Sequence, residues 1–187
     1  MPTPSEVYRC LLLPTGNGFP LWTPEPNEML PDEKRDKGIM IGDVGIIKAD
    51  GSFDFLFNIC VSSSDPINRD RVPPEFENVA SESHIPVTIG GGFSFTCSST
   101  EGAVLTLPEG ASRVDLDEMA TLRDQAFKHG QAWYQYARLE RGREFDNGAF
   151  YLITGCDQAK CWGIASVSNI SGACAVSLMF TAAQLSG

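Results

Sequence analysis

The sequence feature that most constrains the fold is an apolar stretch near the C-terminal end, residues 150–167. Its two ends, 149–154 and 162–168, are rich in β-branched and aromatic side chains and are separated by a short polar segment. This pattern is typical of two strands joined by a turn. We expect the two runs to pair as a hairpin, and 173–180 to return as the third strand of a meander.

Two further hairpins are expected earlier in the chain. The β-rich runs 38–47 and 53–59 flank Asp50-Gly51, a dipeptide that favours a type I′ turn because both central residues take positive φ. The runs 93–97 and 103–107 flank a turn rich in serine, threonine and glycine. The sequence therefore predicts a mostly antiparallel sheet.

The first of these hairpins carries two local signals. Phe53, Phe55 and Phe57 alternate with other residues, which predicts one aromatic face turned inward. Glycines on both sides of Asp43 predict a β-bulge or a close approach of another backbone.

One long helix is predicted over about 115–141. Asp115 followed by Glu118 matches a capping box, and Gly142 suits the position just past a helix end. Gly130 suggests a closely packed neighbour, because glycine costs roughly 1 kcal/mol relative to alanine inside a helix. The apolar residues at helical spacing are interpreted as a core stripe: Leu116, Met119, Ala120, Ala126, Phe127, Trp133, Tyr134 and Ala137.

The N-terminal region, 1–36, is expected to be a proline-rich arm with one short strand over 7–13. The remaining residues, 37–187, are expected to form a single domain, which could be a module of a longer chain. The sequence thus predicts an α+β fold in which hairpins and a C-terminal meander pack on one long helix.

Charge narrows the range of partners. The chain has 24 acidic and 14 basic residues and a formal net charge of −10, so its surface repels phosphate backbones and anionic lipids. This disfavours nucleic acid and membrane partners unless a local basic patch exists. The one basic cluster, 138–143, is interpreted as a solvated helix end. Without a signal peptide pattern or an apolar span, the expected location is cytoplasmic, with all six cysteines reduced.

Several motifs resemble a large family of proteins from mushroom-forming fungi (basidiomycetes). They are GIMIGDVGII at 38–47, DGSFDFLFNIC at 50–60, EGAVLTLPEG at 101–110, and YLITGCD at 151–157 with WGIAS from 162. The resemblance covers nearly all of the chain and implies membership without implying an activity. It also implies a chain that often continues beyond the last strand. Residues 151–155 are similar to a strand-turn pattern of gasdermin-type pore-forming immune effectors, which implies a membrane-active alternative.

A cysteine-dependent enzyme is one candidate function. Cys156 follows a Thr-Gly pair at a predicted turn, beside Asp157 and Lys160, and a nearby cation can lower a thiol pKa. The base would be His129 or His84, with Asp157 or Asp43 as the orienting carboxylate. Acid–base or cation chemistry at converging carboxylates is a further alternative, involving Asp43, Asp50, Asp54 and Asp157.

Cys156, Cys161 and Cys174, together with His84 or His129, would supply the four soft ligands of a zinc site. The spacing of these thiols does not match a zinc knuckle, so we expect neither a metal nor a cofactor.

A ligand pocket between the meander and the helix is the remaining candidate site. Its aromatic lining would come from Trp133, Tyr134, Tyr151 and Trp162, with Asp43 or Cys156 at the mouth. Because every motif is also explained by the fold, the preferred function is a non-enzymatic recognition module that binds a protein or a small ligand, in fungal sensing or defence proteins. A hydrolase or transferase that uses Cys156 and a membrane-active module are the alternatives.

Overall fold

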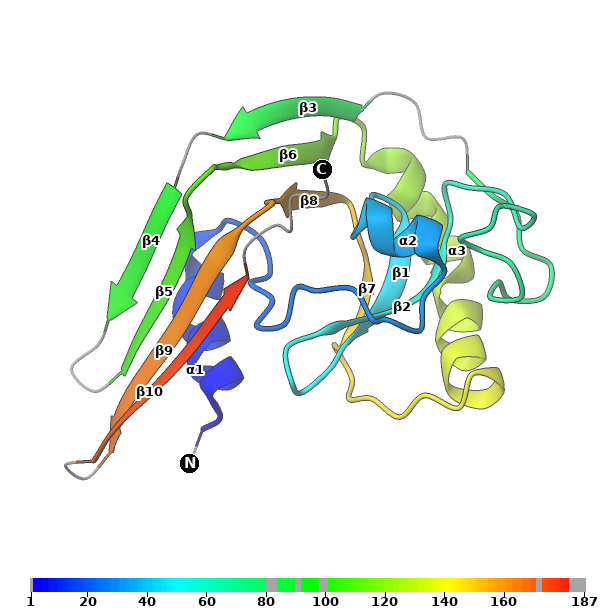
Figure 1. Cartoon of the computed structure of the whole chain (residues 1–187). Coiled ribbons are helices and arrows are strands. Elements are labelled where there is room, and N and C mark those ends of the chain that lie inside the picture. Colours follow the sequence, from blue (N-terminus) through cyan, green and yellow to red (C-terminus); the bar gives the residue numbers. More distant parts are fainter. Residues whose placement is uncertain (1, 80–83, 90–91, 98–100, 171–172, 182–187) are drawn as a thin grey trace.

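Antiparallel strands and helices share the chain, which is an α+β protein (Figure 1). The computed structural model describes residues 2–79, 84–89, 92–97, 101–170 and 173–181. The helices are α1 (Pro4–Leu12), α2 (Asp32–Lys37) and α3 (Ala120–Gln135), with a 3₁₀ turn at Leu13–Thr15 and a π-helical turn at Tyr136–Glu140. The strands are β1 (Asp43–Ile47), β2 (Phe53–Asn58), β3 (His84–Ile89), β4 (Gly92–Cys97), β5 (Glu101–Leu107), β6 (Ala111–Leu116), β7 (Phe150–Leu152), β8 (Gly155–Gln158), β9 (Trp162–Ile170) and β10 (Ala173–Thr181).

The described strands form three antiparallel sheets. Their orders are β2-β1-β7, β3-β6-β8 and β10-β9-β5-β4. The second and third sheets are successive parts of one bent ribbon, because β5 leads into β6 and β8 leads into β9 through three-residue connections at 108–110 and 159–161. Figure 1 shows this ribbon as an arch beside the first sheet.

The stretch 150–170 is one strand path that serves all three sheets. Its segments pair in turn with β1, with β6, and with both β5 and β10. The prediction that 149–154 and 162–168 pair with each other is therefore wrong. Each run finds a partner distant in sequence, which local patterning does not reveal. The predicted pairing of 162–168 with 173–180 is confirmed.

The predicted hairpin around Asp50-Gly51 is confirmed as β1–β2, with a different turn. Only Gly51 has a positive φ (+77°), and its N–H donates to the carbonyl of Lys48 (2.9 Å). The geometry is a type I turn followed by a left-handed glycine, one of the common three-residue hairpin loops.

The bulge predicted beside Asp43 is present between Val44 and Gly45. The extra residue is Leu56 of β2, which has no partner on β1. A bulge turns neighbouring side chains out of strict alternation. Phe53, Phe55 and Phe57 are buried as predicted, but Leu56 between them is buried too, so burial along β2 does not alternate.

The N-terminal arm begins with a helix where a strand over 7–13 was predicted. The Thr3 side chain accepts from the Glu6 N–H (3.2 Å), and the Glu6 carboxylate accepts from the Thr3 N–H (2.7 Å), which completes a capping box. The helix α1 packs on β5 and β9, where Tyr8 and Leu12 are buried. Tertiary packing and capping thus outweigh the β propensity of Val7 and its neighbours.

The long helix begins at Ala120, five residues later than predicted, because Asp115 pairs with Ile85 and Gly155 within β6. Gly142 follows the helix with a left-handed φ of +61°, which confirms its predicted role. An added Cβ at Gly130 would meet no atom within 4 Å, so the predicted close neighbour is wrong. The predicted stripe is also partly wrong, because Phe127 is 83% exposed.

Of the three core clusters among the described residues, two lie between a helix and a sheet. Trp133 and Tyr136 pack edge-on against Phe57, so the long helix covers the β2-β1-β7 sheet. The β9–β10 strands instead belong to the sheet covered by α1. The expected packing of the meander on the long helix is therefore confirmed for Phe150 and Leu152 of β7, which pack against the Trp133 cluster, and wrong for the β9–β10 strands. Among the described residues, no helix combines the length and apolar character needed to cross a bilayer.

Candidate functional site

Asp43 lies in a buried polar network, not at the mouth of a pocket. Its Oδ2 pairs with Lys34 Nζ (2.5 Å) and accepts from the Met40 N–H (2.8 Å), and its Oδ1 accepts from Asn58 Nδ2 (2.8 Å). Lys34 also lies 4.4 Å from the Phe55 ring centroid. The side chains of Lys34 and Asp43 are 3% and 0% exposed. Asp43 therefore joins α2 to β1 and β2.

Cys156 has the wrong environment for a nucleophile. Its thiol donates to the carbonyl of Ile39 (3.3 Å). Burial, followed by the nearby carboxylates of Asp43 and Asp157, raises the pKa of this thiol to about 11. A nucleophilic cysteine needs the opposite shift, because the thiolate is the reactive form.

The other members of the predicted enzyme site lie with different partners. Asp157 accepts two hydrogen bonds from Arg113 (2.7 and 2.8 Å). His129 stacks on Trp133, with ring centroids 6.0 Å apart. Within the described part of the chain, no hydrogen bond joins Cys156, His129 and Asp157 as a catalytic set.

Asp50 and Asp54 do not join Asp43 either. Asp50 accepts from the Ser52 N–H (3.0 Å) in the hairpin turn, and Asp54 pairs with Arg143 (3.0 Å). The side chains that the structure describes include no group of three or more metal-ligating residues that could hold an ion. The side chains of His84 and Cys174 lie outside that description.

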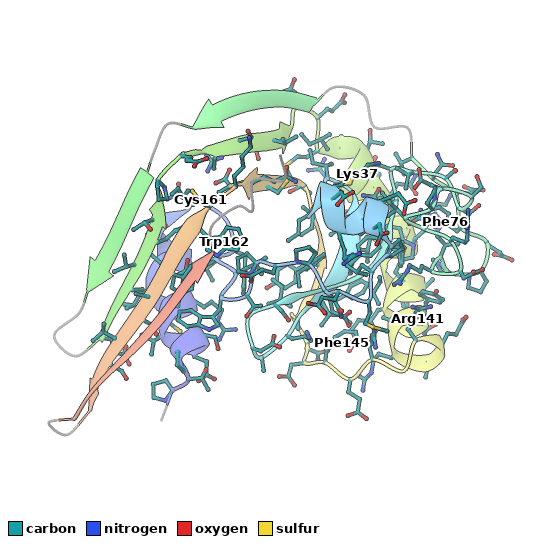
Figure 2. All side chains as sticks on the ribbon, in the orientation of Figure 1. Lys37, Phe76, Arg141, Phe145, Cys161 and Trp162 are labelled. Atoms are coloured by element: carbon teal, nitrogen blue, oxygen red, sulfur yellow. The ribbon has the colours of Figure 1, made fainter. Side chains whose placement is uncertain are left out.

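The predicted aromatic pocket is not assembled, because its residues lie in separate places. Trp133 is only 6% exposed, in the core of the first sheet. Tyr134 contacts Phe145 and Phe150, whereas Tyr151 contacts Phe19. Trp162 packs with the α1 cluster, and Figure 2 shows it well away from Phe145.

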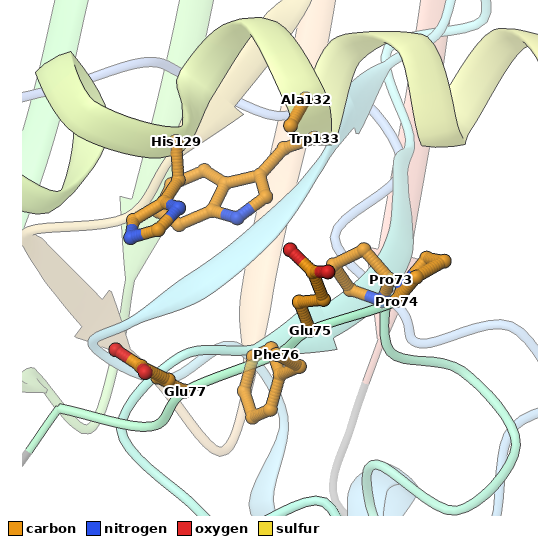
Figure 3. A pocket seen from close by; sticks show the side chains of 8 residues that line it. All are labelled: Pro73, Pro74, Glu75, Phe76, Glu77, His129, Ala132 and Trp133. Atoms are coloured by element: carbon orange, nitrogen blue, oxygen red, sulfur yellow. The ribbon is translucent and has the colours of Figure 1, made fainter.

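A small pocket does lie beside His129 and Trp133. Its walls are the loop 73–77 and α3, and it encloses about 30 Å³, the space of one water molecule (Figure 3). The Nε2 atom of His129 is buried there without a hydrogen-bond partner among the described residues. The pocket is too small for an organic ligand.

The sheet β10-β9-β5-β4 offers a candidate binding surface that is larger than this pocket. Its inner face is covered by α1, and Ala103, Ile164 and Ser166 on that face are 0%, 2% and 4% exposed. On the opposite face Val104, Thr106, Ala165 and Val167 remain partly exposed. We call this second side the outer face.

The strand register extends the outer face across all four strands. By register, positions 93, 95 and 97 of β4 and positions 174, 176, 178 and 180 of β10 align with Val104, Val167 and their neighbours on this face. No charged residue occupies any of these positions, and the sequence carries none from 161 to 187. This run without charge is visible in the sequence, but it becomes a surface only once the register is known.

Comparison of the chain with protein-family models, with curated proteins and with solved structures finds no match. The geometry of the chain itself therefore carries the functional argument.

Proposed function

We propose that the chain is a recognition module that binds a protein partner through the outer face. The observation that supports this is a sheet face without charged residues, on which Val104, Thr106, Ala165 and Val167 are partly exposed, in a chain whose net charge is −10. Antiparallel sheets commonly expose one face, but that face is usually polar. Exposed apolar patches rimmed by polar residues mark interaction sites.

The chemistry of the partner follows from the missing charges. A charged side chain buried against the outer face would lose its hydration and find no ion pair. The partner should therefore present an uncharged apolar strand or helix surface. The nine-residue strands β9 and β10 span roughly 30 Å at about 3.4 Å per residue, and β4 and β5 are shorter, with six and seven residues. Four strands at about 4.8 Å spacing span roughly 19 Å. The resulting area of about 500 Å² suits a small, reversible interface.

A cytoplasmic location and membership of the fungal family are parts of the same proposal. Cys10, Cys60, Cys156 and Cys161 are free thiols, as suits the reducing cytoplasm. Together with the resemblance to the fungal family, this supports a recognition role inside the cell, in sensing or defence.

A membrane-active module is the second candidate, and one specific observation favours it. The span of roughly 30 Å for the uncharged β9 and β10 strands matches the hydrocarbon thickness of a bilayer. The acidic net charge restricts this candidate to lipids without negative headgroups.

One pair of variants tests both candidates. Val167→Lys places a charge on the outer face, and Phe127→Lys places the same charge on the exposed side of α3. Proteins captured on the immobilised chain are identified, purified and titrated against each variant. Flotation with phosphatidylcholine vesicles gives the lipid result.

The proposed function requires a purified partner whose affinity falls at least about 10-fold with Val167→Lys and is unchanged with Phe127→Lys. Vesicle binding with the same dependence, and without a protein partner, would establish the membrane candidate instead. If Val167→Lys behaves like wild type in both assays, the outer face is not the docking surface.

A further inference from the structure

Strand β10 is the outermost strand of the sheet β10-β9-β5-β4 (Figure 1). It pairs with β9 over its full length, from Ala173 opposite Ile170 to Thr181 opposite Trp162, without a shift in register. None of the described strands pairs with its other edge. Along that edge, alternate residues therefore direct backbone N–H and C=O groups away from the sheet, with no partner strand to receive them.

Most edge strands in natural proteins carry a feature that prevents pairing with another chain. Among the described edges, β3 contains Pro86, which cannot donate to a ladder, and β2 contains Asp54. The strand β7 has only three residues, and β8 has four, one of which is Asp157. These edges are protected by proline, by charge or by shortness.

The strand β10 has none of these features. Its sequence, ACAVSLMFT, contains no proline and no charged residue, and its nine residues make it the longest of the described edge strands. The opposite edge of the same sheet, β4, is also uncharged but has only six residues. A long, regular and uncharged edge is a template for another strand.

The charge of the chain favours a second copy as that strand. Two copies with a net charge of −10 each repel one another wherever acidic residues meet, so they can approach most closely at a segment without charge. The segment 161–187, which includes β10, is such a segment. An antiparallel pair of identical strands also satisfies two-fold symmetry, and β10 has no like charges that would oppose each other in it.

We propose that β10 is a homodimer interface, in which β10 of one copy pairs antiparallel with β10 of a second copy. The two four-stranded sheets then form one continuous sheet. Full overlap of the nine residues places Ser177, the middle position, opposite its counterpart in the second copy. Because the two-fold axis of an antiparallel pair is perpendicular to the sheet, both outer faces lie on the same side. The dimer uses the edge of the sheet, so it does not depend on the docking function proposed for the face.

The size of the contact predicts a reversible dimer. Nine residues at about 3.4 Å each span roughly 30 Å, and a sheet edge about 10 Å thick gives roughly 300 Å² per copy. A stable complex buries about 800 Å² per partner, so association should require micromolar protein.

Sedimentation equilibrium at increasing protein concentration tests the dimer. Wild type should pass from monomer to dimer between about 1 and 100 µM. Added sodium chloride should strengthen the association, because it screens the repulsion between acidic copies. Ser177→Lys places two like charges opposite each other and should raise the dimer dissociation constant at least about 10-fold. Ser94→Lys is the matched control, because it adds the same charge to β4, the other edge of this sheet.

A cross-link tests the register and decides the question if Ser177→Lys does not fold. Opposed residues of an antiparallel pair lie close enough for a disulfide. Ser177→Cys, in a chain whose Cys10 and Cys174 are replaced by serine, should therefore link two copies when oxidised glutathione is added. Mass spectrometry of the linked peptide identifies the bond, and Ser94→Cys in the same background should not form it.

Circular dichroism establishes that each variant is folded. Wild type that stays monomeric at about 100 µM, or a dimer that Ser177→Lys leaves unchanged, overturns the interface. Loss of the dimer with Ser94→Lys alone would assign the contact to β4 instead. Val167→Lys, which lies on the face and not on the edge, should leave the dimer intact; loss of the dimer in that variant would assign the association to the outer face and overturn the edge.

Discussion

Lys34 and Asp43 depend on each other because both charges are buried. Removing one partner from such a pair leaves the other without compensation, at a cost of about 3–5 kcal/mol. Asp43→Asn should therefore lower the free energy of unfolding by that amount, as measured by urea denaturation. The double variant Asp43→Asn with Lys34→Met should recover much of the loss. Additive losses would show that the two side chains are not coupled.

Cys156 should react slowly with alkylating reagents. With a pKa of about 11, its thiolate fraction at pH 8 is about 0.1%, which makes it more than about 100-fold less reactive than an unperturbed thiol. Mass spectrometry after iodoacetamide treatment should find the exposed Cys10 modified first. Fast labelling of Cys156 in the folded protein would contradict the burial argument.

The same shift gives a pH dependence of stability. The folded state holds the Cys156 proton more tightly than the unfolded chain, whose thiol has a pKa of about 8.5. The resulting contribution is present below about pH 8.5 and is lost as pH rises through the folded pKa of about 11. Replacement by serine should reduce this alkaline loss in denaturation curves, whereas Cys10→Ser should leave it unchanged.

Single residues also show how far the sequence could be interpreted. The glycines on both sides of Asp43 predicted the bulge, because glycine weakens a strand and is usually found there at a bulge or a close backbone contact. The partners of Asp43 could not be predicted, since Lys34 and Asn58 reach it from other elements. The contact between the Tyr136 hydroxyl and the carbonyl of Arg71 could not be predicted either, because the two residues are 65 positions apart in the sequence.

At the scale of elements, capping decides the N-terminal helix. Thr3→Ala should cost about 1 kcal/mol, because Thr3 satisfies a backbone donor that the helix leaves free. Urea denaturation of this variant should be compared with Ser62→Ala, which removes only an exposed contact between side chains. Equal stability of the two variants would show that the Thr3 cap does not stabilise α1.

Two glycines of different elements should respond oppositely to alanine. In β1, a Cβ at Gly45 would clash with the Phe53 ring and lie 2.6 Å from the Asp54 carbonyl, so Gly45→Ala should destabilise by at least about 2 kcal/mol. In α3, Gly130→Ala meets open space and should stabilise by about 0.5–1 kcal/mol. Thermal denaturation of both variants gives the sign.

The hairpins and the helices differ in how well the sequence predicts them. Both short hairpins were predictable, because turn residues and alternation act locally. The start of the long helix was not, since Asp115 matches a cap in sequence but pairs with two strands in space. The Thr3–Glu6 spacing was a usable signal for α1, which the proline content concealed.

At the scale of the whole molecule, α1 completes the third sheet. Deleting residues 2–15 should uncover the inner face, raise the fluorescence of a hydrophobic dye and speed amide exchange in β5 and β9. Exchange in β1 and β2 should change little. Arg9→Ala, on the exposed side of the same helix, is the control. Unchanged exchange in β5 would mean that the sheet holds its structure without α1.

The order of the strands in the three sheets could not be predicted from the sequence, and the reason is physical. Strand identity follows from local pattern, but partner choice follows from packing between distant segments. The candidate ligand site failed in the same way, since its aromatic residues are each explained by a different core.

The continuous path from β7 to β9 has a mechanical consequence. Between β7 and β8, the backbone of Ile153 bonds to Gly42 and Asp43 and the carbonyl of Thr154 accepts from Leu116, so the first two sheets are tied together through these two residues. Gln158 lies immediately before the connection 159–161, and its side chain donates to the carbonyls of Lys37 and Ile39. A displacement of β9 is therefore expected to reach α2, the helix that carries Lys34, through the backbone of β8 and the Gln158 side chain.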